Sequence, residues 1–188
     1  MLKTRRFKIQ GVTPLMPKNG QTADPLNPFA QAMKKVSGKR NKTDADHEEL
    51  SRIEFLGSLY LDDAGKPCVP GENIEAMFRE AARKIKKGQQ AKSGIMSDGN
   101  WPIIYKGPKT ADALWKEKNF VDRRGVVIGR VRVMRTHPIF RDWALEFDLT
   151  YDDSLLDDDE VTNIMEIAGR IVGLLDYRPK FGRFAVIS

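Results

Sequence analysis

Few residues of this chain could perform acid–base or metal chemistry. The 188-residue sequence has two histidines, His47 and His137, and a single cysteine, Cys68. It therefore offers no Cys/His set for zinc and no internal disulfide. The acidic run 157–160 lies at a predicted helix start, where capping and the helix dipole explain it better than a metal does. We expect no metal and no cofactor, and His47 is the one candidate general base for a metal-independent ribonuclease.

The C-terminal segment offers a different chemistry. Arg178, Lys180 and Arg183 stand beside Phe181 and Phe184, just before an apolar closing strand. Cations that neutralise phosphates, next to rings that stack on bases, are typical of single-stranded nucleic-acid contact. A tight turn with solvated charges before an edge strand is the alternative interpretation.

A second group of cations lies on a predicted helix that follows a glycine-containing start. Arg79, Arg83, Lys84 and Lys87 occupy its polar face. Backbone N–H groups at such a helix start can also hold phosphate. A solvated helix face explains the same pattern, so the sequence leaves both interpretations open.

Further candidate phosphate contacts are Arg130, Arg132 and Arg135 in a predicted strand, and Lys39 and Arg40 in a long loop. Residues two apart on a strand share a face, so we expect Arg130 and Arg132 to lie side by side. Two such arginines repel unless an anion or acids neutralise them. The alternative to a nucleic-acid contact is pairing with the acids of a neighbouring strand, Glu146 or Asp148.

Base-separating or stacking side chains are predicted in the loops and in the C-terminal turn. The candidates are Phe29, Met33, Trp101 and Phe181. For each of the loop residues, packing inside the protein is the competing interpretation.

Composition indicates a soluble globular protein with an anionic partner. Hydrophobic residues make up 40% and charged residues 31%, and 32 Lys and Arg against 26 Asp and Glu give a net charge of +6. Sixteen cations fall between residues 79 and 141, whereas 142–160 holds nine acids and no base. This asymmetry suits polyanion binding and head-to-tail self-association. No membrane-length apolar run or signal peptide is present, and we expect a cytoplasmic protein.

Hydrophobic periodicity predicts the elements that position these residues. Strands are expected at 4–12, 53–60, 126–134, 143–151 and 181–187. A short helix is expected at 44–50, with longer ones at 71–88 and from 154–160 to 172. Residues 14–46 and 89–122 read as irregular, with a short hairpin near 101–105.

This order predicts an α+β fold: one ferredoxin-like (RRM-like) domain over residues 1–188. Its βαββαβ core would carry two long loop insertions, at about 14–52 and 89–122. The first and third strands would be central, both helices would cover one face, and the other face would be free to bind. An ordinary RNA-recognition domain is not expected, because the aromatic motif lies on the fourth strand instead of the third.

Two segments carry a resemblance to a known family. Residues 68–79 (CVPGENIEAMFR) resemble the Pro-Gly start of the first helix in the RAMP superfamily of RNA-binding proteins. Residues 173–184 (GLLDYRPKFGRF) look like the glycine-rich stretch before that superfamily's closing strand. With the predicted topology, the chain resembles CRISPR-associated backbone subunits of the Cas-seven type, or a compact phage or mobile-element relative, although it is short for that family.

The resemblance implies a non-catalytic protein that binds a guide RNA, or single-stranded DNA, and oligomerises along the strand with other effector subunits. The insertions would then reach between nucleotides or onto the next copy. Some members cleave bound RNA with a loop aspartate, for which Asp44 and Asp46 are the candidates. The alternatives are an endoribonuclease of the same superfamily and a viral or protein assembly module without nucleic acid.

Overall fold

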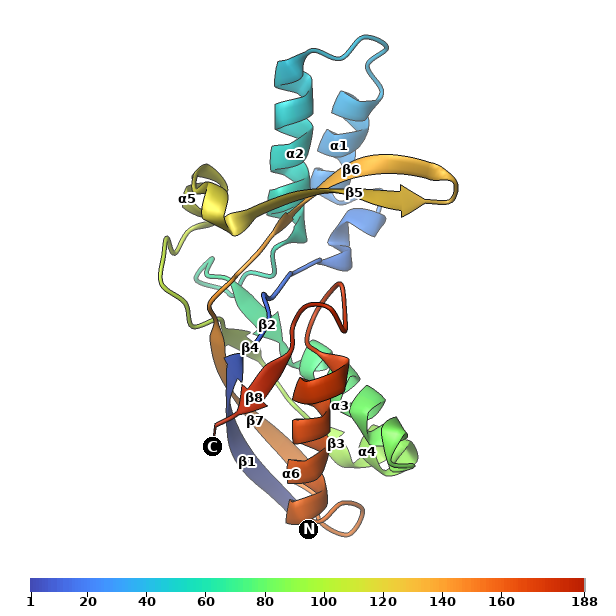
Figure 1. Cartoon of the computed structure of the whole chain (residues 1–188), viewed down its shortest axis with the longest axis vertical. Coiled ribbons are helices and arrows are strands. Elements are labelled where there is room, and N and C mark those ends of the chain that lie inside the picture. The colour runs from blue at the N-terminus through green and yellow to red at the C-terminus, as the bar shows by residue number, and fades with distance from the viewer. Residues whose placement is uncertain (188) are drawn as a thin grey trace. The chain divides into compact units, whose positions relative to one another are not determined.

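The computed structural model describes residues 1–187, except for the side chain of Ile128, and divides the chain into two compact α+β units. The first unit consists of Met1–Met16, Leu61–Lys106 and Phe140–Ser188, and the second of Pro17–Tyr60 and Gly107–Ile139. The second unit thus consists of two segments that are inserted into the sequence of the first (Figure 1). They overlap the predicted insertions but have different bounds.

The first unit contains a four-stranded antiparallel sheet of order β3-β7-β1-β8. Its strands are β1 (Leu2–Gly11), β3 (Ile95–Met96), β7 (Ala144–Asp152) and β8 (Phe184–Val186). The two long strands β1 and β7 are central, and their register places Phe7 opposite Phe147 and Ile9 opposite Leu145. The alternating patterns of residues 4–12 and 143–151 predicted both strands correctly.

Alternation along β1 and β7 separates an apolar face of the sheet from a polar one. Helices α3 (Gly71–Lys84) and α6 (Asp158–Ile167), the latter continued by a π-helical turn at Ala168–Val172, lie against the sheet (Figure 1). The predicted stripe of α3 is buried, as are the inward residues of the sheet. These side chains form the core that holds α3 and the C-terminal segment in place.

The predicted irregular region 89–122 is more ordered than expected. It contains α4 (Gly88–Gly94), β3 and β4 (Asn100–Pro102). The hairpin expected near 101–105 is wrong, because β4 pairs with the distant strand β2 (Cys68–Pro70). A partner about thirty residues away in sequence leaves no local turn signal from which the pairing could be predicted.

The second unit begins with helices where the sequence indicated a loop, a short helix at 44–50 and a strand, and the short helix is confirmed as the first half of α2. After a 3₁₀ turn (Gly20–Ala23), α1 spans Pro28–Ser37 and α2 spans Asp44–Ser58. Asn27 caps α1 by accepting from the Phe29 N–H, and proline suits the first helical position. The strand predicted at 53–60 lies mostly in α2, because short apolar runs do not distinguish a strand from a buried helix.

The strand predicted at 126–134 is also wrong, since this segment contains a turn. Strands β5 (Val121–Ile128) and β6 (Val131–Pro138) form an antiparallel hairpin, preceded by α5 (Ala111–Lys116) and a 3₁₀ turn at Lys118–Phe120. Gly129, with φ 63°, and Arg130 make the two-residue turn. The apolar residues on both sides of this turn continue the period-two pattern, so the sequence did not show that the chain reverses direction here.

Across residues 1–187, none of the helices is long and apolar enough to cross a membrane.

Candidate functional site

The polar face of the sheet neutralises its own charges. Arg6 donates to Asp148 at 2.8 Å, Lys8 lies 3.3 Å from Glu146, and the hydroxyls of Thr4 and Thr150 are 2.8 Å apart. The Arg6 guanidinium lowers the pKa of Asp148. Glu146 and Asp148 therefore pair with β1, not with Arg130 or Arg132, and this face offers little free positive charge.

Free cations gather instead at the end of α3. Arg79 is paired with Glu75 at 3.2 Å and Lys87 with Glu160 at 2.5 Å, so these two predicted contacts are already engaged. Arg83 and Lys84 are exposed and make no ion pair within the described part of the chain.

Two cations absent from the prediction join them. Lys86 and Lys92 line a concavity of about 280 Å³ together with Arg83. The stem of Arg83 lies across Gly88, where an added Cβ would come within 2.6 Å of the arginine Cγ. Lys86 and Lys92 belong to the basic run and to α4, and only the folded chain brings them beside Arg83.

The glycine-rich loop of residues 173–183 is closed at its base by backbone hydrogen bonds. The N–H of Leu174 donates to the carbonyl of Gly182 at 2.9 Å, and the Gly182 N–H donates to the Pro14 carbonyl at 2.8 Å. Gly182 has φ 74°, and a Cβ there would lie 2.0 Å from the Leu174 oxygen. Only glycine fits, which fixes where the loop leaves the core.

Between these closing bonds the loop presents cations and rings. Lys180 lies over the Phe181 ring at 5.9 Å, and the rings of Tyr177 and Phe181 are 5.7 Å apart. Arg178 is 3.3 Å from Glu80 of α3. Arg183 differs from the other loop cations: its Nε donates to the Pro179 carbonyl at 2.8 Å, so it stabilises the loop.

The loop and α3 share one concave surface. A depression of about 480 Å³ is lined by Glu80 and Lys84 of α3 and by Tyr177 and Arg178 of the loop. Leu175 and Tyr177 hold φ near +60°, which is costly for residues with a side chain and is typical of functional loops. We define the basic surface by its exposed cations: Arg83, Lys84, Lys86, Lys92, Arg178 and Lys180.

The remaining predicted cations belong to the second unit, where several have internal partners. Lys39 donates to Asp46 at 2.5 Å, and this bond lowers the pKa of Asp46 to about 2. Arg135 donates to Glu54 at 2.5 Å. Arg40 is exposed on the connection between α1 and α2.

The predicted pairing of Arg130 with Arg132 on one strand face is wrong. Arg130 lies in the β5–β6 turn, whereas Arg132 lies on β6 with its stem across Gly125. A Cβ added at Gly125 would lie 3.2 Å from the Arg132 Cδ.

The predicted wedge residues are largely packed. Phe29 and Met33 are half-buried on α1, and Phe29 lies against Gly57 of α2. Trp101 is half-buried and its Nε1–H donates to the Ser97 hydroxyl at 3.1 Å. Phe181 contacts Tyr177 as described above and is the one candidate wedge that belongs to the segment carrying the basic surface.

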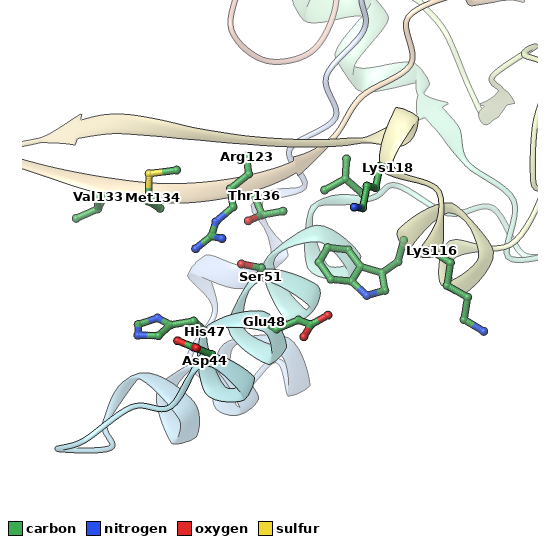
Figure 2. A pocket seen from close by; sticks show the side chains of 12 residues that line it. Asp44, His47, Glu48, Ser51, Lys116, Lys118, Arg123, Val133, Met134 and Thr136 are labelled. Carbon is green, nitrogen blue, oxygen red and sulfur yellow. The ribbon is translucent and has the colours of Figure 1, made fainter.

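A separate pocket of about 1010 Å³ lies within the second unit (Figure 2). Helix α2 contributes Asp44, His47, Glu48 and Ser51, which are spaced i, i+3, i+4, i+7 and therefore share one helix face. Across from them Figure 2 shows Arg123 of β5 pointing toward α2, with Val133, Met134 and Thr136 on β6. Trp115, Lys116 and Lys118 line a further side, and Val121 also lines the pocket. These residues fall mostly in the helix predicted at 44–50, but the sequence did not show that β5, β6 and α5 pack opposite this face.

Other candidate chemical residues have structural surroundings. Asp46 belongs to the capping box of α2, with Thr43 as the N-cap. Asp157 caps α6 by accepting from the Glu160 N–H at 2.8 Å, as the acidic run predicted. The second histidine, His137, is buried on β6. Within residues 1–187, no group of three His, Cys, Asp or Glu side chains is placed to hold a metal ion.

Comparisons with known proteins give a fold likeness. No family model matches the chain. No curated protein matches it. Among solved structures, a chain of the cryo-electron microscopy structure of the Type III-B Cmr-beta bound to cognate target RNA matches with TM-score 0.50 and 11% identity. The match covers all of this chain and 59% of the other, so this chain spans less than two thirds of its length.

Proposed function

We propose that this chain binds single-stranded nucleic acid, RNA in preference to DNA, without cleaving it. The observation that supports this most is the basic surface: six exposed cations from α3, the 85–92 segment and the glycine-rich loop, next to the Tyr177–Phe181 ring pair. Phosphates bind to such cations, and bases stack on exposed aromatic rings. The strained loop backbone fits a site that is held ready for a ligand.

The fold supports the same proposal. We infer a ferredoxin-like core in the sequence β1-α3-β3-β7-α6-β8, with the sheet order β3-β7-β1-β8. The matching Cmr-beta structure is bound to target RNA, and this likeness favours a RAMP-type RNA-binding role for the present chain. A CRISPR-associated backbone subunit or a compact phage relative is the family that we propose on these grounds.

The β5–β6 hairpin is our candidate for the part that separates bases, in place of Phe29, Met33 and Trp101. Val127 and Val131 near its turn are 64% and 63% exposed, which is unusual for large apolar side chains. Arg130 and Arg132 flank Val131, so an apolar tip is combined with phosphate-binding charge. Apolar wedges that insert between bases are known to work in this way.

Self-association along the strand, and with other effector subunits, is part of the proposal. The acids of 142–160 are partly used inside the unit, since Met1 and Lys3 pair with Asp152, Asp153 and Asp158. Asp159 and Glu166 on α6 are exposed and make no ion pair within the described residues. Light scattering with and without a 40-nucleotide RNA tests this: we expect assembly only with RNA, and a constant monomer mass would contradict it.

The decisive experiment compares two charge-matched double variants in anisotropy titrations with a labelled single-stranded RNA and its DNA equivalent. Lys84→Ala/Lys86→Ala removes two cations of the basic surface, and Arg6→Ala/Lys8→Ala removes two from the self-paired sheet face. Each lost phosphate contact should reduce the slope of log K against log salt by about 0.7. We therefore expect a slope lower by about 1.4 in the first variant and little change in the second.

Three results would contradict the proposal. Equal losses in both variants would show a non-specific charge effect. No shift of any strand at low salt would favour the protein assembly module. Shortened RNA after incubation with wild type, but not with His47→Ala, would favour the endoribonuclease.

A further inference from the structure

The pocket of the second unit contains charges that the protein itself does not satisfy. Six titratable side chains line it: Asp44, His47, Glu48, Lys116, Lys118 and Arg123. None of the six makes an ion pair or a side-chain hydrogen bond with another residue of the described chain. Other charged groups of the second unit are paired, for example Glu54 with Arg135 and Asp46 with Lys39. Two cations, Lys118 and Arg123, and two carboxylates therefore line the pocket without neutralising one another, whereas the side chain of Lys116 points away from it (Figure 2).

One side of the pocket can hold a flat apolar group. Trp115 is half-buried and lines the pocket, and its ring is fixed by a tilted contact with Phe55 of α2, at 5.4 Å between centroids. Val121 also lines the pocket, and Val133 and Met134 of β6 line its other end (Figure 2). An immobilised indole with an open side is a suitable stacking partner for a nucleobase.

Cations from two sides of the pocket favour an anion. Lys116 and Lys118 lie next to Trp115 in the sequence, and Arg123 points toward α2 from β5 (Figure 2). Guanidinium and ammonium groups together bind a phosphate with charge-assisted hydrogen bonds.

The α2 side carries acceptors. Asp44 and Glu48 lie one helical turn apart, with Ser51 one turn beyond Glu48 on the same face. A carboxylate accepts two parallel hydrogen bonds, which matches the adjacent N1–H and N2–H groups of guanine. Adenine presents a donor beside an acceptor on the corresponding edge, so a carboxylate satisfies it less well.

We propose that this pocket is a binding site for a guanine nucleotide: the base stacks on Trp115 and donates to Asp44 or Glu48, and the phosphate binds Arg123 and Lys118. The site lies wholly within the second unit, and the inference does not rest on strand binding by the basic surface. A free mononucleotide should occupy it.

The test is isothermal titration of the full chain with GMP, AMP, guanosine and ribose 5-phosphate, with tryptophan fluorescence as a second readout. We expect GMP to bind at least about fivefold more tightly than AMP, and more tightly than either fragment, because base and phosphate both contribute. Trp115→Leu should abolish the fluorescence change, and Arg123→Ala should weaken GMP about tenfold or more. Asp44→Asn/Glu48→Gln should remove the preference for GMP over AMP.

Lys86→Ala is the matched control, since it removes a cation of the basic surface and should leave GMP binding unchanged. Circular dichroism melts confirm that each variant is folded. Absence of saturable GMP binding, or binding unchanged in both Arg123→Ala and Trp115→Leu, would overturn the site. Equal affinity for GMP and AMP would overturn the guanine assignment. Because the ligand is a mononucleotide, a failure of GMP to bind does not affect the proposal that the basic surface binds single strands. A failure of the strand titrations likewise does not affect the nucleotide site.

Discussion

The buried carboxylate of Glu54 on α2 binds Arg135 and the backbone of β6 at once. It accepts from the Arg135 Nη1 at 2.5 Å and from the Thr136 N–H at 3.0 Å. Glu54 therefore fixes the β5–β6 hairpin to the helix beside it. A two-stranded sheet is marginal alone and needs such an attachment.

Glu54→Ala should loosen this hairpin. Removing the acceptor leaves the Thr136 N–H without its partner and frees Arg135, at a cost of about 1–3 kcal/mol in the free energy of unfolding. Hydrogen exchange should show faster exchange in 131–138 than in β1 or β7. Glu49→Ala on the exposed side of α2 is the control. Equal protection of Thr136 in both variants would mean that packing alone holds the hairpin.

The sequence predicted those elements whose pattern is local. Strand β1 and strand β7 alternate cleanly, and α3 has an uninterrupted apolar stripe. The hairpin turn at Gly129 was missed because the apolar alternation continues across it. The pairing of β2 with β4 was missed because the two strands lie about thirty residues apart in sequence. Proline before α1 was read as a loop signal, although Pro28 begins the helix.

For the site, sequence identified the cations but not which of them are free. Glu75 precedes Arg79 by four residues on a predicted helix, and this spacing alone indicates an ion pair. The partner of Lys87, Glu160, is on another element and depends on tertiary structure. The same reason explains why Lys86 and Lys92 were missed beside Arg83, and why the polar stripe of α2 did not indicate a pocket.

Asp46 should make the start of α2 sensitive to acid. Hydrogen bonds from Lys39 and Thr43 lower its pKa from 3.8 to about 2. A lowered folded-state pKa contributes stability that is complete above the unfolded value and is lost as pH falls to the folded one. The difference in Tm between wild type and Asp46→Asn should therefore be constant near neutral pH and shrink from about pH 4 to about pH 2. A difference that persists at the lowest pH would contradict this origin.

Cys68 should be an unreactive thiol in the folded chain. It is buried on β2, and desolvation raises its pKa to about 11 from 9.0. Because the thiolate is the nucleophile, this shift alone lowers the reactive fraction at pH 8 about 100-fold. Iodoacetamide labelling followed by mass spectrometry should give almost no adduct in buffer and rapid single labelling in guanidinium chloride. Fast labelling of the native chain would show that β2 opens readily.

Three glycine-to-alanine variants should separate backbone strain from steric clash at the base of the glycine-rich loop. Gly182 has φ 74° and almost no space, Gly65 has φ 73° with open space, and Gly20 has open space and no positive φ. Gly65→Ala should cost about 1 kcal/mol from strain alone, and Gly20→Ala should be neutral or slightly stabilising. Gly182→Ala adds a clash with the Leu174 backbone, so we expect a loss above about 3 kcal/mol or an unfolded loop. Chemical denaturation ranks the three variants. Equal losses at Gly182 and Gly65 would mean that the loop can move away from Leu174, and that closing bonds at 174–182 do not fix its position.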